Sequence, residues 1–223
     1  NPVDGAMYVL ERRQHDPDLF RIARDGSWTN LGPVWDAHKS KGGDVLPNGL
    51  LYSLAGDELE IIELRTCRLI SSQHIGGLHH GQIGDLAYSL DDELLYGLHT
   101  HSGLVSVDPN SAQMVEIADV DVSSITDGNA AAFTPDGRLL LKGASASDPS
   151  VELTLEVDLV LRTASAVNTS PAASITDGLA CHTADADWDG VPDDVDADDD
   201  NDGVSDVDEG LGGDPSADSD GDG

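Results

Sequence analysis

The sequence predicts an all-β fold of repeated four-stranded units, followed by an irregular acidic segment. Three observations lead to this prediction. Short apolar tetrads recur every 44 or 45 residues, and turn-forming residues come before most of them. From Asp185 to Gly223 the chain has 17 acidic residues and no lysine or arginine, within a protein of 223 residues and net charge -32. This change in composition divides the chain into two expected domains, residues 1–183 and residues 184–223.

The tetrads define the repeat. They are MYVL from Met7, LYSL from Leu51, LYGL from Leu95 and LLKG from Leu140. Turn sequences precede the last three tetrads, and two of them contain Pro-Asn-Gly or Pro-Asp-Gly, which favours a tight connection between strands. Each tetrad is therefore expected to be a strand that follows a turn.

Further apolar stretches surround each tetrad. A strand before the turn is expected at Asp85 and Gly128, and third strands at Asp18, Leu59, Gly103 and Val151. Fourth strands are expected at Trp28, Arg68, Gln113 and Thr163. Four strands in about 44 residues is the spacing of a β-propeller blade. The pattern resembles bacterial propeller repeats over residues 5–183, which implies a propeller-like domain of about four blades. A β-sandwich is the alternative fold, although it predicts no fixed period.

The ends of the repeat region leave two alternatives for the ring. The chain enters at a second strand, Met7–Leu10, and leaves through DGLACHT at 177–183, which matches a first strand. That strand would pair with the N-terminal strands and close four blades. Alternatively, the chain is part of a larger propeller, and its ends indicate a piece of a longer protein. Cys67 and Cys181 are expected to be free thiols, with a single disulfide as the alternative.

The acidic segment contains a calcium-loop pattern. Calcium takes six to eight oxygen ligands from a short loop, with glycine at position 6 and a backbone carbonyl at position 7. The first copy offers the side chains of Asp185, Asp187, Asp189, Asp193 and Asp196 and the carbonyl of Val191. The second copy offers Asp198, Asp200, Asp202, Asp206, Glu209 and the carbonyl of Val204. A third copy begins with Asp218, Asp220 and Asp222. Gly190 and Gly203 fall at position 6, so the glycines are in register with the acids.

The spacing of the two loops excludes a pair of EF-hands, because Ala197 alone separates them and each EF-hand loop needs flanking helices. The segment resembles the thrombospondin type 3 repeat of bacterial surface proteins. The stretch EGLGGDPSADSDGDG, 209–223, resembles the linker of that family. The resemblance implies a calcium-bound, rod-like stalk with these acids as ligands and Asp214 as a further candidate. The alternative is a solvated, disordered acidic run.

These features predict an exported calcium-binding protein, secreted or at the cell surface. Loops of this kind bind calcium at about 10⁻⁴ to 10⁻³ M, which suits extracellular calcium. The propeller is expected to be an interaction or adhesion module for a protein or glycan. Both parts are acidic, which argues against nucleic acid as a partner. No apolar run reaches the length of a membrane span.

No enzymatic activity is expected. The alternative is a calcium-dependent extracellular hydrolase that uses acids in the propeller channel, with candidates at Asp44, Asp85, Asp127 and Asp177. These acids stand beside glycines, so we interpret them as turn caps between blades. A second weak candidate is a metal site formed by His79, His80, His99 and His101, because two histidines two apart on a strand point to one face.

Overall fold

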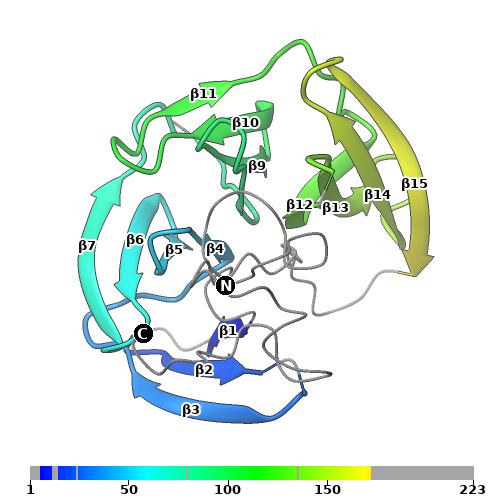
Figure 1. The fold of residues 1–223 in the computed structure, drawn as a ribbon. Helices are drawn as coiled ribbons and strands as arrows, with labels where there is room; N and C mark the ends of the chain where they lie inside the picture. The colour runs from blue at the N-terminus through cyan, green and yellow to red at the C-terminus, as the bar shows by residue number, and fades with distance from the viewer. Residues whose placement is uncertain (1–5, 12–14, 24, 79, 135, 172–223) are drawn as a thin grey trace, which may run out of the picture.

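The structure, a computed structural model, describes residues 6–11, 15–23, 25–78, 80–134 and 136–171. Four antiparallel sheets stand round a common centre, each with its first strand inside and its last strand on the rim (Figure 1). We call them blades 1 to 4 in chain order. The prediction of an all-β, propeller-like fold is therefore confirmed. No helix in the described ranges is long and apolar enough to cross a membrane.

In the described residues the blades contain 15 strands. Blade 1 has β1 (Met7–Leu10), β2 (Asp18–Ile22) and β3 (Trp28–Pro33). Blade 2 has β4 (Gly43–Val45), β5 (Leu50–Ala55), β6 (Glu58–Glu63) and β7 (Arg68–His74). Blade 3 has β8 (Ala87–Tyr88), β9 (Leu95–His99), β10 (Gly103–Val107) and β11 (Met114–Glu116). Blade 4 has β12 (Ile125–Phe133), β13 (Leu139–Ser145), β14 (Val151–Asp158) and β15 (Thr163–Pro171).

The recurring tetrads lie in equivalent strands. Those at Leu51, Leu95 and Leu140 fall in β5, β9 and β13, the second strands of blades 2, 3 and 4. The tetrad at Met7 is β1, which pairs antiparallel with β2 just as β5 pairs with β6. β1 thus occupies the place of a second strand, as the 44-residue period predicted.

The predicted turns form because glycine accepts a left-handed backbone. In blade 2 the Gly49 N–H donates to the Leu46 carbonyl at 2.9 Å, with φ of 72° at Gly49. In blade 4 the Gly137 N–H donates to the Thr134 carbonyl at 2.9 Å, with φ of 78° at Gly137. Non-glycine residues rarely adopt such φ values. The two turns therefore have the same design, and each lies directly before a second strand.

Three hydrophobic clusters join neighbouring blades. Leu19 and Ile62 belong to the cluster between blades 1 and 2, which also contains the buried free thiol of Cys67. Leu54 and Leu95 belong to the cluster between blades 2 and 3. The third cluster joins blades 3 and 4. No cluster of the described residues joins blade 4 to blade 1. The predicted closing strand at 177–183, with Cys181, lies outside those residues, so ring closure and its alternative stay predictions.

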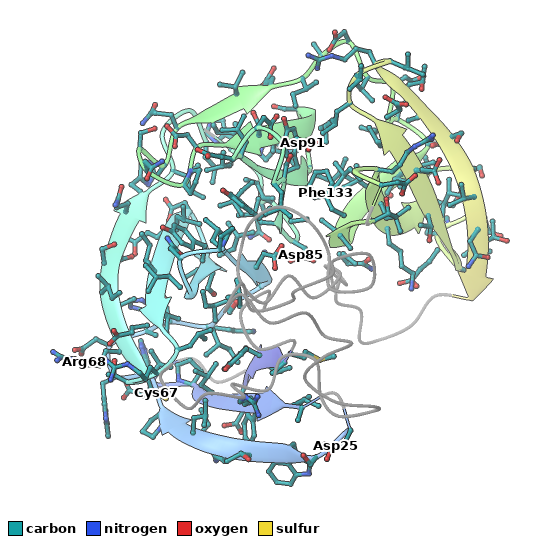
Figure 2. All side chains as sticks on the ribbon, viewed as in Figure 1. Asp25, Cys67, Arg68, Asp85, Asp91 and Phe133 are labelled. Carbon is teal, nitrogen blue, oxygen red and sulfur yellow. The ribbon has the colours of Figure 1, made fainter. Side chains whose placement is uncertain are left out.

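The carboxylate of Asp85 joins three blades at the centre of the ring (Figure 2). Its Oδ1 accepts hydrogen bonds from the N–H of Gly43 at 2.9 Å and of Leu86 at 2.8 Å. Its Oδ2 accepts from the N–H of Ala131 at 2.8 Å. These donors belong to blades 2, 3 and 4, and Asp85 is 2% exposed. One buried side chain therefore fixes how the inner strands meet.

Glycines beside these acids allow the inner strands to approach closely. A Cβ on Gly42 would lie 2.0 Å from Oδ1 of Asp85, and a Cβ on Gly84 would lie 1.5 Å from the carbonyl oxygen of Gly128. No side chain fits at such distances. Our interpretation of the recurring Gly-Asp pairs as turn caps is wrong for Asp85, because its carboxylate bridges blades through donors that lie far apart in the sequence.

We predict that Asp85→Ala lowers the free energy of unfolding by about 3 kcal/mol or more. Three backbone N–H groups lose their buried acceptor, and each such loss costs about 1–3 kcal/mol. Urea denaturation of the full chain measures the change. Asp91→Ala is the control, because Asp91 is an exposed acid in the turn that follows β8. Equal stability of the two variants would contradict the role of Asp85.

Candidate functional site

The described histidines gather at one end of the ring. Each blade starts at the centre and its strands alternate in direction, so the connections between second and third strands lie at the same end. We call this the histidine end. Every described histidine lies in one of these connections, flanks one, or contacts a residue there: His15, His38, His74, His80, His99 and His101. Imidazoles bind protons and transition metals, and all of the described imidazoles lie at or beside this end.

His38 and Glu60 form a hydrogen-bonded polar pair at this end. Glu60 lies in β6 and is 0% exposed, whereas the side chain of His38 is 52% exposed. The imidazole Nδ1 lies 2.7 Å from Oε1 of Glu60. The backbone N–H of His38 also donates to both carboxylate oxygens at 3.1 Å. The hydrogen bond to Glu60 raises the pKa of His38, since it favours the protonated ring.

Glu58 completes a cluster with this pair. Glu58 and Glu60 are two residues apart on β6, so their side chains leave the same face of the strand. One potential ligand atom from each of His38, Glu58 and Glu60 lies within 4.8 Å of the others. The ring of His15 packs edge-on against that of His38 with centroids 5.6 Å apart. One imidazole and two carboxylates are donors that suit a divalent transition metal.

The histidine site predicted from sequence does not form as expected. His99 is 4% exposed, and both ring nitrogens are used: the Ser102 N–H donates to Nδ1 at 3.1 Å, so Nε2 carries the proton and donates to the His80 carbonyl at 2.7 Å. His101 lies in the turn after β9, so it does not share a strand face with His99. His79 lies outside the described residues. His99 is therefore a satisfied core histidine.

A hollow opens beside His99 and His101 at the same end. It has a volume of about 510 Å³ and lies between the β9–β10 turn and the connection from blade 3 to blade 4. Asp119 and Asp121 from that connection also line it. A second hollow of about 500 Å³ lies where blades 3 and 4 meet through their other turns, and it is lined by Asp91, Asp92 and Arg138. Both hollows combine carboxylates with apolar side chains, among them Val120 and Val122 in the first and Val160 and Leu161 in the second.

Two of the carboxylates considered for a hydrolase, those of Asp44 and Asp85, accept hydrogen bonds from backbone N–H groups. Oδ2 of Asp44 accepts from the N–H of Tyr88 at 2.9 Å, and Oδ1 accepts from Val45 at 2.8 Å. Asp44 therefore joins blade 2 to blade 3, as Asp85 joins its neighbours. Burial raises the pKa of Asp44 to about 6, and the two backbone hydrogen bonds oppose that rise. The side chain of Asp127 and all of Asp177 lie outside the described part.

Two exposed tryptophans mark the rim of blades 1 and 2. Trp28 is 68% exposed and Trp35 is 65% exposed. Trp35 forms a parallel bridge with Arg68, two residues before Ile70, which is 55% exposed. Leu31, on β3, is 37% exposed. We call Trp28, Leu31, Trp35 and Ile70 the tryptophan rim. Sequence reasoning missed it, because an apolar side chain on an outer strand has the same local pattern as one in the core.

All of the calcium ligands predicted from sequence, Asp185 to Asp222, lie outside the described residues. The calcium site, its ligands and the boundary at Thr183 therefore stay predictions.

Comparisons with known proteins found solved structures of low similarity. No protein-family model matches the sequence, and no curated protein matches it. A glutaminyl cyclase structure from Myxococcus xanthus is similar with a TM-score of 0.47 and 16% identity, over 73% of this chain and 70% of that one. A protein from Lactobacillus plantarum is similar with a TM-score of 0.42 and 17% identity, over 78% of this chain. The match spans 55% of the Lactobacillus chain.

The first comparison corrects one prediction. We expected a protein without enzymatic activity, whereas the first structural neighbour is a glutaminyl cyclase, an enzyme. That expectation is contradicted and we withdraw it. Likeness at this level of identity and TM-score assigns no reaction to this chain.

We predict that Asp44 makes the fold less stable as pH rises. The pKa of Asp44 in the folded chain is about 6, above the ordinary value of 3.8. Its stabilising contribution to the free energy of unfolding is therefore full below about pH 4 and is lost as pH rises through 6. Between pH 4.5 and 7.5 the wild-type chain should lose about 2 kcal/mol more of its free energy of unfolding than Asp44→Asn. Urea denaturation at a fixed calcium concentration measures both. Parallel pH curves for the two proteins would show that Asp44 titrates normally.

Proposed function

We propose that the chain is an exported calcium-binding protein, in which a propeller-like domain presents an interaction surface and calcium organises residues 184–223. The observation that carries the calcium half is the repetition of one loop pattern. Two complete copies, 185–196 and 198–209, place an acid at positions 1, 3, 5, 9 and 12 and a glycine at position 6. A random acidic segment has no reason to keep glycine at position 6 of both copies, where calcium loops need a sharp turn.

The resemblance to thrombospondin type 3 repeats supports a stalk. In such a stalk the metal supplies the attraction that the sequence lacks, since like charges repel and few apolar side chains are present to form a core. Binding of calcium then supplies the free energy of folding. The affinity expected for these loops suits the calcium concentration outside cells, which supports export.

The tryptophan rim supports the interaction half of the proposal. Tryptophan is enriched in the cores of protein interfaces, and its ring presents a large rigid surface that also stacks on sugars. Trp28 and Trp35 both leave about two thirds of their surface in solvent. Neither belongs to the buried hydrophobic cluster between blades 1 and 2. A protein or glycan that covers this rim would bury that surface.

We predict at least two calcium sites in the full chain. Calorimetric titration of metal-free protein should show them, with little response to magnesium. Asp187→Asn with Asp189→Asn should remove the first site, and Asp200→Asn with Asp202→Asn the second, because each pair takes two ligand charges from one loop.

The control for the calcium experiment is Asp91→Asn with Asp119→Asn, which removes the same charge from exposed positions in blade 3 and in the connection from blade 3 to blade 4. It should retain both sites. A flat titration of the wild-type chain, or equal binding by all variants, would make residues 185–223 a solvated acidic run.

We predict that Trp28→Ala with Trp35→Ala weakens partner binding at least tenfold without loss of stability, since both side chains are exposed. Arrays of glycans and of secreted and cell-surface proteins provide the probes. Val160→Ala with Leu161→Ala is the control, because these side chains are 90% and 70% exposed on blade 4. Binding that survives the tryptophan changes would place the interaction surface elsewhere.

A further inference from the structure

We propose that His38, Glu58 and Glu60 bind a divalent transition-metal ion of the zinc class, at a site separate from the calcium loops. One potential ligand atom from each residue already lies within 4.8 Å of the others. Zinc bonds to nitrogen and oxygen are about 2.0–2.2 Å long, so ligands of one ion lie about 3–3.5 Å apart. Small side-chain rotations would bring the three donors to that spacing.

The frame of the site is rigid on the carboxylate side. Glu60 is 0% exposed and receives the backbone N–H of His38 on both oxygens. β6 also pairs with β5 through Glu60 and Ser53, which keeps the strand in register. Preorganised ligands lose little conformational entropy on binding, which favours the metal. Glu60 therefore acts as the fixed ligand, and His38 and Glu58 adjust to the ion.

The charge balance of the site also favours a cation. A buried carboxylate is costly unless it is paired with a positive group. Among the described residues His38 is the partner that forms an ion pair with Glu60, and Glu58 adds a second carboxylate close by. A divalent ion would neutralise both carboxylates together, whereas a protonated imidazole supplies one positive charge.

The donor set distinguishes this site from the calcium loops. Calcium and magnesium prefer oxygen donors alone, whereas imidazole suits zinc, copper and nickel. His38 has a side chain that is 52% exposed, so an ion can reach it from solvent. The ring of His15 packs edge-on against that of His38 beside the site. The histidine end would then hold a transition metal while the acidic segment holds calcium.

The test is a zinc titration of the full chain in excess calcium, which occupies the oxygen-only loops. Zinc bound per chain is measured by elemental analysis after gel filtration, and affinity by calorimetry. We expect one zinc site that His38→Ala and Glu58→Gln each weaken at least tenfold. His101→Ala is the matched control, because His101 is a histidine at the same end outside the cluster.

A second readout separates metal binding from simple loss of the ion pair. Zinc should raise the melting temperature of the wild-type chain and of His101→Ala, but not that of His38→Ala, with each protein compared with itself in chelator. Zinc binding that persists in both cluster variants would overturn the proposal. Zinc that excess calcium displaces would assign the ion to the acidic segment and would overturn it equally. The comparison of the cluster variants with wild type and His101→Ala in one buffer does not depend on whether the calcium loops bind calcium.

Discussion

The arrangement of the inner strands depends on the buried carboxylate of Asp85. Its two oxygens accept backbone N–H groups from three successive blades, and each of those groups would otherwise lack an acceptor in the centre of the ring. Asp44, one blade earlier, forms the same kind of bond between blades, because its carboxylate accepts the backbone N–H of Tyr88. Blades in a propeller otherwise contact their neighbours through side-chain packing, so these acids add the directional bonds that set the angle between blades.

The positions of the side chains at the histidine end depend on the hydrogen bonds of Asp85 at the centre. Asp85 holds Gly43, Gly43 pairs with Ser53, and Ser53 pairs with Glu60 across blade 2. The position of the Glu60 carboxylate, and with it the cluster of His38 and Glu58, therefore follows from the register that the central acid fixes. Hydrophobic burial between blades supplies the bulk of the attraction, and the buried polar groups select one arrangement from those that burial alone would allow.

The strands could be predicted from the sequence because their signals are local and periodic. The tetrads at Met7, Leu51, Leu95 and Leu140 repeat the same alternation, and the turns before them carry Gly49 and Gly137. The roles of Asp44 and Asp85 could not be predicted in the same way, because a Gly-Asp pair also has local turn chemistry and the inter-blade bonds join residues more than 40 apart.

The site was harder to predict than the fold. The sequence shows that Glu58 and Glu60 are two residues apart on a strand. Acids in that pattern are typical of a solvent-exposed face, so the full burial of Glu60 could not be predicted. His38 reaches Glu60 from a connection 22 residues earlier. That contact depends on how blades 1 and 2 pack. The rings of His99 and His101, the pair that was noticed, stay in edge-on contact with centroids 5.9 Å apart. They form no metal site as predicted, because the strand stops before His101 and both ring nitrogens of His99 are already hydrogen-bonded.

The central claim is that calcium organises the acidic segment of an otherwise propeller-like protein. Small-angle X-ray scattering of the full chain, in calcium, in magnesium and in chelator, tests it most directly. The account predicts that calcium alone changes the scattering curve, and that the change disappears when Asp187, Asp189, Asp200 and Asp202 are all replaced by asparagine. Superimposable curves in the three conditions would contradict it.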